Sequence, residues 1–176
     1  SPSPTLRTHC ATASSTTPGT TSGSSWRASN DQGWETGVSV RANLSRTSVE
    51  RFRAWANDQS LALSPVPWAA EGFFAAPGDA AGGLGRTVEH HQGLFYLQEA
   101  ASMLPVQVLD HVTGGAFESV IDLCAAPGSK TTQLAARMGP RGVIVANEPS
   151  ASRLKTLAFN LTRAGVGSAV LLSDDG

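Results

Sequence analysis

The sequence is poor in cysteine, with only Cys10 and Cys124 among its 176 residues. Two cysteines make no disulfide framework, so a small secreted disulfide scaffold is excluded and a reducing, cytoplasmic setting is expected. The chain also lacks an excess of charge of either sign. The formal net charge is −1, which excludes nucleic-acid binding through a global basic field and leaves only local patches. No apolar run is long enough for a membrane span or a signal core. We therefore expect a protein that is neither secreted nor embedded in a membrane.

What is present favours a globular protein of one or two small domains, since 40% of the residues are hydrophobic. Residues 1–37 are rich in serine and threonine, and their apolar residues show no period. Such a stretch buries too little to offset its ordering entropy, so we expect either a disordered tail or a segment that does not belong to the native protein. The last letters, "LLSDDG", directly follow an apolar run, which indicates a fragment of a longer fold.

Residues 38–112 are expected to form a small α+β unit. A short strand is predicted at Val38–Ala42. Thr47 and Glu50 have the spacing of a capping box, in which a hydroxyl and a carboxylate satisfy free N–H groups at a helix start. The apolar face of that helix is formed by Val49, Phe52 and Ala56.

The rest of this unit is expected to be extended, then a loop, then helical. Two prolines make 61–68 an extended segment, and the glycines of 79–86 indicate a loop. The stretch 94–112 is predicted to be a helix that contains Pro105 or is interrupted there.

Residues 113–176 alternate between apolar runs of strand length and capped helices. Strands are predicted at 119–124, 142–147 and 169–175, with helices at 129–138 and 150–165 that stop at glycines. Buried strands in a β-α-β-α-β order indicate a parallel sheet with right-handed crossovers, which is a doubly wound α/β half. Such sheets bind ligands at the carboxyl ends of their strands.

The stretch "DLCAAPGSKTTQLAA" joins the first of these strands to its helix. Gly128 leaves room for a ligand near the backbone, and a helix capped by Ser129 offers N–H groups to a carboxylate or a phosphate. A plain strand-turn-helix connection explains the loop equally well. Ser129 separates Gly128 from Lys130, which excludes a P-loop, and a single glycine excludes the dinucleotide fingerprint.

Acidic residues follow the second and third predicted strands. Glu148 stands where a carboxylate accepts both hydroxyls of a ribose. Asp174 and Asp175 stand where a carboxylate accepts from an adenine amino group. Each acid taken singly is better explained as a helix cap or a surface residue. Three features at three successive strand ends describe a site for an adenosine with a small charged tail, which fits S-adenosylmethionine.

The stretches "YLQEAASMLPVQVLD" and "VIDLCAAPGSKTTQLAARMGPRGVIVANEPSASRLKTLAFNLTRAGV" closely resemble the NOL1/NOP2/Sun family of RNA (cytosine-5)-methyltransferases. Within that family the chain is most similar to the bacterial type F branch, which methylates small-subunit ribosomal RNA. The resemblance covers residues 38 to 176, and nothing in 1–37 matches it. It implies a Rossmann-like S-adenosylmethionine-binding half-sheet at 113–176, preceded by the α+β unit at 38–112. The implied cofactor is S-adenosylmethionine, and the implied partner is RNA, specifically ribosomal RNA.

The resemblance also implies the roles of particular residues. Glu148 matches the acid that binds the ribose, and Asp175 the acid near the adenine. Arg153, one helical turn past Glu148, is a further candidate contact. The segment that holds the methionine part of the cofactor corresponds to Cys124, Ala125, Ala126, Pro127, Gly128, Ser129 and Lys130. Four arginines lie in the unit that is beside the RNA-binding face in the family, although a solvated surface explains them equally well: Arg41, Arg46, Arg51 and Arg53.

The family's chemistry uses a cysteine that adds to carbon 6 of cytosine and a second cysteine that helps release the product. Both lie beyond the third strand in the family, so the catalytic residues are expected after Gly176 and this chain alone is expected to be inactive. Cys124 is interpreted as a small buried residue and not as a substitute. The alternatives are a non-catalytic adenosine- or RNA-binding module and, less favoured by the loop spacing, an oxidoreductase-type nucleotide domain. No metal is expected at Glu89–His91, because adjacent histidines without a partner at i+4 make no helical pair.

Overall fold

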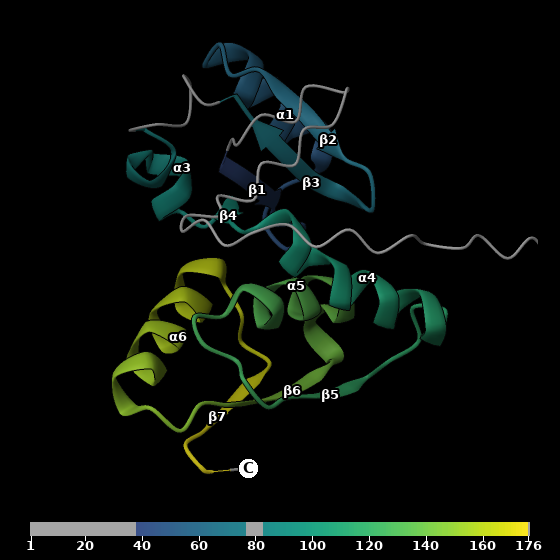
Figure 1. Cartoon of the computed structure of the whole chain (residues 1–176), viewed down its shortest axis with the longest axis vertical. Helices are drawn as coiled ribbons and strands as arrows, with labels where there is room; N and C mark the ends of the chain where they lie inside the picture. The colour runs from purple at the N-terminus through teal and green to yellow at the C-terminus, as the bar shows by residue number, and fades with distance from the viewer. Residues whose placement is uncertain (1–37, 77–82, 176) are drawn as a thin grey trace, which may run out of the picture. The chain divides into compact units, whose positions relative to one another are not determined.

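The computed structural model describes residues 38–76 and 83–175, all within the unit that runs from Trp34 to Gly176 (Figure 1). The predictions for 1–37 lie outside the described residues, as does the 79–82 part of the expected loop. No helix in the described ranges is long and apolar enough to cross a membrane.

The first half of this unit is built on a four-stranded antiparallel sheet with the order β2-β3-β1-β4. Its strands are β1 (Val38–Ala42), β2 (Leu63–Val66), β3 (Ala69–Ala75) and β4 (Phe95–Leu97). The predicted strand at Val38–Ala42 is confirmed, and the predicted extended segment at 61–68 is confirmed for Leu63–Val66, whereas Pro67 and Trp68 form a turn. Strand β3 was not predicted, and the segment of β4 was wrongly predicted to be helical. Three residues are too few to show a period of two, so only pairing with β1 reveals β4 as a strand.

Helix α1 (Val49–Asp58) packs its predicted apolar face, with Phe52 and Ala56 buried. The predicted capping box is wrong by one residue. Ser48 is the cap, and its hydroxyl accepts a hydrogen bond of 3.2 Å from the backbone N–H of Arg51. Since Arg51 stands where a capping box needs a glutamate or glutamine, the helix has a simple serine cap.

Between β3 and β4 lie η1 (Leu84–Arg86) and α3 (Val88–His91). The long helix α4 (Ala100–Thr113) follows β4. Pro105 lies inside α4 and does not interrupt it. A proline removes one helical hydrogen bond, here the one to the carbonyl of Ala101. Both residues are exposed, so water can solvate that carbonyl and the helix continues to Gly114.

The second half is a three-stranded parallel sheet with the order β5-β6-β7. It consists of β5 (Ser119–Asp122), α5 (Ser129–Met138), η2 (Gly139–Arg141), β6 (Val143–Asn147), α6 (Ala151–Ala164) and β7 (Ala169–Leu172). The predicted β-α-β-α-β order and the parallel pairing are confirmed. The helix stops are confirmed too, with Gly139 after α5 and Gly165 after α6.

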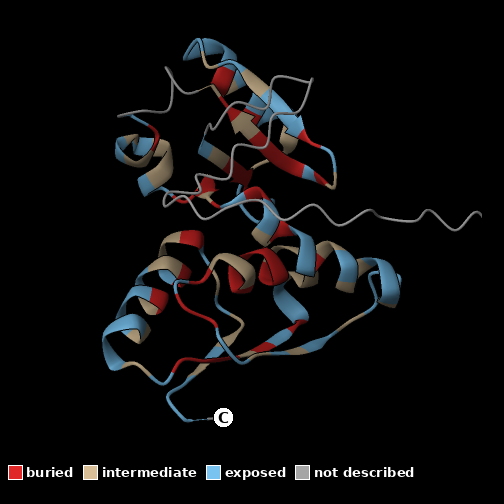
Figure 2. Ribbon diagram, viewed as in Figure 1, coloured by how far each residue is buried: buried red, intermediate tan, exposed pale blue. Residues whose placement is uncertain are grey.

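Helices α5 and α6 lie on the same face of the parallel sheet (Figure 1). The strand order advances in one direction, and right-handed crossovers then place both helices on one side. The core lies between the sheet and these helices, and includes Ile144, Ala146, Leu157 and Leu161. Figure 2 shows stretches of the parallel sheet in the colour of exposed residues. The exposed apolar residues in or directly after its strands are Ile121, Leu123, Val143, Val170 and Leu172.

A buried polar network joins the two sheets. Arg41 in β1 donates from Nε to Gln98 Oε1 at 2.7 Å, and from Nη2 to Thr132 Oγ1 in α5 at 2.8 Å. Gln98 donates to Gln133 Oε1 at 3.1 Å, and Gln133 donates to Glu71 Oε1 in β3 at 3.3 Å. All five side chains are buried. Because buried polar groups are costly when unpaired, this network fixes how α5 docks on the first sheet.

Candidate functional site

The candidate site lies where the three parallel strands end. The segment from Leu123 to Gly128 follows β5, Glu148 follows β6, and Asp174 and Asp175 follow β7. Backbone hydrogen bonds tie these ends together. Ala125 N–H donates to Asn147 O at 3.0 Å, and Glu148 N–H donates to Leu172 O at 3.1 Å. The tertiary fold therefore brings the predicted acids and the predicted loop to one sheet edge.

Gly128 begins α5 with a φ of 105°, a conformation that side chains rarely adopt. A Cβ at this position would lie 3.1 Å from Leu157 Cδ1 and 3.6 Å from the Cβ of Asn160. The missing side chain therefore lets α6 pack against the loop. The close approach of a ligand stays a prediction for this glycine, and the geometry adds a packing role to it.

The start of α5 also differs from the prediction in its cap. Ser129 is the first helical residue, and Gly128 occupies the cap position with no side-chain hydrogen bond. The first-turn N–H groups of a helix have no intrahelical partner, and they carry a partial positive charge. The N-terminus of α5 therefore keeps the donors that a carboxylate needs. Lys130 lies half-buried in the same first turn.

Cys124 is exposed, so its interpretation as a small buried residue is wrong. Leu123 and Cys124 are both exposed in the turn that follows β5, whereas Ala125 and Ala126 are buried in the core under the helices. The course of this turn, and not the small size of the side chain, decides that Cys124 faces solvent.

Glu148 is 2% exposed, and its carboxylate is oriented by two neighbours. Oε1 accepts a hydrogen bond of 3.0 Å from the backbone N–H of Ser150. Oε2 lies 3.3 Å from Nη1 of Arg153. A carboxylate has about four acceptor positions, so two of them stay available for hydroxyl groups.

Arg153 connects the first two parts of the site. Its Nη2 donates to the carbonyl oxygen of Ala126 at 3.0 Å, while its Nη1 pairs with Glu148. The side chain of Arg153 is 60% exposed and that of Glu148 is 2% exposed, so a solvated guanidinium compensates the charge of a buried carboxylate. The predicted proximity of Arg153 to the site is in agreement with these contacts.

Asn147, the last residue of β6, binds the backbone of the segment that follows β7. Its side chain accepts from Asp174 N–H at 3.0 Å and donates to Asp174 O at 2.9 Å. The backbone N–H of Asp175 donates to Asp174 Oδ1 at 2.8 Å. The side chain of Asp175 is exposed, so it remains free to face a ligand at this edge.

Sequence reasoning assigned no role to Asp122, the last residue of β5. Its Oδ2 accepts a hydrogen bond of 2.7 Å from Thr131 Oγ1, in the first turn of α5. This contact spans the loop and fixes its two ends. An acid at the last position of a strand, directly before a glycine-bearing loop, is the signal that could have found it.

The four arginines predicted beside an RNA-binding face do not form one surface. Arg41 is 1% exposed, and burial lowers its pKa to about 10. Arg46 donates from Nε to Ala164 O at 3.1 Å, at the end of α6. The guanidinium of Arg53 lies 5.1 Å above the ring of Phe73. Arg51 is exposed. Including Arg41 in an RNA face was wrong, because it is a buried structural residue.

The described ranges 38–76 and 83–175 offer no clustered metal ligands. They hold no group of three or more histidine, cysteine, aspartate or glutamate side chains placed to share an ion. The imidazoles of His90 and His91 lie 5.9 Å apart in α3.

Comparison with known families gives two adjoining matches. Residues 25–100 match the N-terminal domain of 16S rRNA methyltransferase RsmF. Residues 108–176 match 16S rRNA methyltransferase RsmB/F. The expectation that the family resemblance begins at residue 38 is therefore wrong, since the first match begins at residue 25.

Individual relatives point to the same family as these two matches. The chain is 52% identical over 139 residues to the ribosomal RNA small subunit methyltransferase F of Enterobacter sp. (strain 638), a match that covers 78% of this chain and 29% of that protein. It is 49% identical over 138 residues to the protein of the same name from Vibrio parahaemolyticus, with the same coverage. The chain thus spans less than a third of the length of these relatives.

Solved structures show the same fold. A methyltransferase homolog protein from Pyrococcus horikoshii superposes with a TM-score of 0.71 at 36% identity, covering 78% of this chain and 44% of that one. NSun6 from Pyrococcus horikoshii, solved with SFG, superposes with a TM-score of 0.67 at 18% identity, covering 78% and 58%. The expected Rossmann-like α/β class is confirmed.

Proposed function

Because the chain belongs to the family of the 16S rRNA methyltransferases RsmB and RsmF, we propose that it forms the cofactor-binding half of an S-adenosylmethionine-dependent RNA (cytosine-5)-methyltransferase. The observation that carries this proposal is the meeting of three features at one edge of the parallel sheet. These are the loop from Cys124 to Lys130, Glu148 and Asp175. The contacts of Arg153 to Ala126 O and to Glu148 join the first two.

The chemistry of these residues fits the cofactor part by part. The N-terminus of α5 suits the carboxylate of a methionine group. Glu148, fixed by the Ser150 N–H, offers acceptors to ribose hydroxyls. Asp175 offers an acceptor to an adenine amino group. When bound, S-adenosylmethionine supplies an activated methyl group, and the residues of this chain hold and orient it.

Ribosomal RNA is the proposed substrate, because the relatives carry the name of a small-subunit ribosomal RNA methyltransferase. Arg46, Arg51 and Arg53 are the exposed arginines of the predicted RNA-facing group, and we assign them to contact with the RNA phosphate backbone. The cysteine nucleophile is proposed to lie outside this chain, because Cys124 belongs to the cofactor loop.

Titration calorimetry with S-adenosylmethionine tests the proposal. We expect saturable binding at one site, with S-adenosylhomocysteine competing and NAD not binding. Binding of adenosine and S-adenosylmethionine with equal affinity would favour the non-catalytic adenosine-binding module. Binding of NAD in preference to both would favour the oxidoreductase-type domain and overturn the proposal.

A further inference from the structure

Tyr96 of β4 reaches the cofactor loop of the other sheet. Its hydroxyl donates a hydrogen bond of 3.1 Å to the carbonyl oxygen of Pro127. The same oxygen accepts a second hydrogen bond, of 2.8 Å, from the side-chain amide of Asn160 in α6. The loop carbonyl is therefore held from two elements that are distant from it in sequence.

This carbonyl belongs to the peptide group that joins Pro127 to Gly128. The other polar group of that peptide, the Gly128 N–H, donates to Ala125 O at 2.7 Å. Both ends of the peptide are thus bonded, and its plane is fixed. Since Gly128 is the cap residue of α5, the plane of this peptide sets the direction in which the first-turn N–H groups point.

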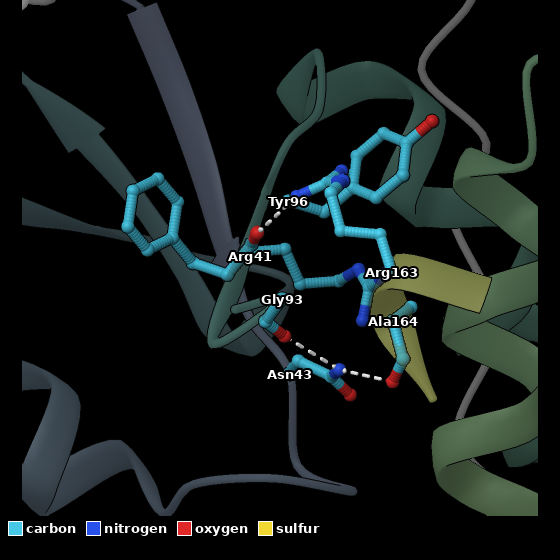
Figure 3. A pocket seen from close by; sticks show the side chains of 7 residues that line it. Arg41, Asn43, Gly93, Tyr96, Arg163 and Ala164 are labelled. Carbon is cyan, nitrogen blue, oxygen red and sulfur yellow. Dashed lines mark hydrogen bonds between the residues drawn. The ribbon is translucent and has the colours of Figure 1, made fainter. Parts of the chain in front are cut away.

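The ring of Tyr96 lies near two cations. The guanidinium of Arg41 lies 6.0 Å from the ring centroid, and that of Arg163 lies 5.3 Å from it (Figure 3). Both arginines are anchored, Arg41 by Gln98 and Arg163 by the carbonyl of His90 at 2.6 Å. Tyr96 is 7% exposed, and burial raises the pKa of its hydroxyl, which therefore keeps the proton that it donates.

Arg163 lies beside the anchored end of α6. Asn43 donates from Nδ2 to Gly93 O at 2.8 Å and to Ala164 O at 2.9 Å, as Figure 3 shows. Asn160, the second donor to the loop, belongs to the same helix. The antiparallel half of the unit therefore positions the loop in two ways. Tyr96 contacts the loop directly, and Asn43 binds the end of α6, the helix that carries Asn160.

We propose that Tyr96 is a positioning residue for the cofactor: its hydroxyl, on a ring that lies near the guanidinium groups of Arg41 and Arg163, orients the Pro127–Gly128 peptide and so the donors at the start of α5. This inference rests on the proposed function for its ligand. The four-stranded sheet is then part of the cofactor site, although it contributes no group to the edge where Glu148 and Asp175 lie.

The test compares Tyr96→Phe with Ser39→Ala in the complete 176-residue chain. Tyr96→Phe keeps the ring near the two arginines and removes only the hydroxyl. Ser39→Ala is the matched control, because it also removes one hydroxyl that donates to a backbone carbonyl, that of Gln98 at 2.7 Å, in the same sheet. Neither change empties a large core volume, so both variants are expected to fold.

Two quantities are measured. The first is amide hydrogen exchange of Ala125 and Gly128 in the ligand-free protein, and the second is the Kd for S-adenosylmethionine. For Tyr96→Phe we expect loop exchange to accelerate and the Kd to rise, each by about two- to tenfold, which corresponds to one neutral hydrogen bond. For Ser39→Ala we expect both quantities to stay at the wild-type values.

The outcomes separate the inference from the proposed function. Unchanged loop exchange in Tyr96→Phe overturns the inference whatever the protein binds. Equal changes in Tyr96→Phe and Ser39→Ala also overturn it, since they would show a general loss of stability. Absence of S-adenosylmethionine binding by the wild-type chain overturns the proposed function, and the exchange measurement still decides the role of Tyr96.

Discussion

Arg41 and Thr132 are separated by 91 positions in the sequence, yet a hydrogen bond of 2.8 Å joins their side chains in the interior. The bond links β1 of the antiparallel sheet to α5, the helix that follows the loop proposed to bind the cofactor. The pKa of Arg41 is lowered to about 10, mainly by burial, so the guanidinium stays charged at neutral pH.

Replacing Arg41 is therefore expected to destabilise the fold. Arg41→Met keeps much of the side-chain volume and removes two hydrogen bonds from a charged donor, to Gln98 and Thr132. At about 1.5 kcal/mol each, the loss is about 3 kcal/mol in the free energy of unfolding, measured by urea denaturation. Arg51→Met, at an exposed position of α1, is the control and should change it little. Equal losses in the two variants would contradict the structural role of Arg41.

Glu148 is expected to dominate cofactor affinity among the acids of the chain. Glu148→Ala removes two charge-assisted acceptors for ribose hydroxyls, at a cost of about 1.5–3 kcal/mol, or about a tenfold to hundredfold rise in Kd. Glu118 precedes β5 at the opposite end of the sheet and is exposed, so Glu118→Ala serves as the control. Calorimetry that gives the same Kd for both variants would show that the ribose site is misplaced.

Gly128→Ala is expected to harm both stability and binding. The positive φ alone costs an alanine about 1–2 kcal/mol, and the added Cβ would also press on Leu157 at 3.1 Å. Gly114→Ala isolates the first effect, because Gly114 has a φ of 62° and a Cβ added there would meet nothing within 4 Å. We predict a larger loss of unfolding free energy for Gly128→Ala than for Gly114→Ala. A loss of cofactor affinity is expected for Gly128→Ala alone.

The stability of the protein should fall as the solution becomes more acidic, in part through His90. Burial lowers the pKa of His90, and the charges of Arg163 and His91 lower it further. The unfolded chain therefore binds a proton first, so folded-state stability is fully present above the ordinary histidine pKa and is lost as pH falls through the lowered one. Urea denaturation between pH 8 and pH 5 should show a shallower loss for His90→Gln than for the wild type. The exposed His111→Gln is the control, and equal slopes for wild type and His90→Gln would refute the assignment.

This chain by itself is expected to bind S-adenosylmethionine and to transfer no methyl group. The family resemblance places the nucleophilic cysteine after the third parallel strand, and Cys124 lies in the cofactor loop before it. Methyl-labelled S-adenosylmethionine and unmethylated small-subunit ribosomal RNA provide the assay, with a full-length relative such as the Enterobacter protein as positive control. Label on cytosine that depends on this chain would contradict the expectation.

The sequence by itself determined the second half of the fold. The alternation of apolar runs and amphipathic helices predicted the parallel order of β5, β6 and β7. The ends of α5 at Gly139 and of α6 at Gly165 were predicted from the residue types at these positions. These signals act over a few residues, because they depend on the periodicity of side chains and on which φ angles a residue tolerates.

Only the tertiary structure decided the features that join distant segments. A strand of three residues, such as β4, carries no readable period, and it becomes a strand by pairing with β1. The burial of Arg41, the exposure of Cys124 and the contact of Tyr96 with Pro127 depend on which surfaces meet after folding. A sequence names the side chains that can donate or accept, and packing selects the partners that each of them finds.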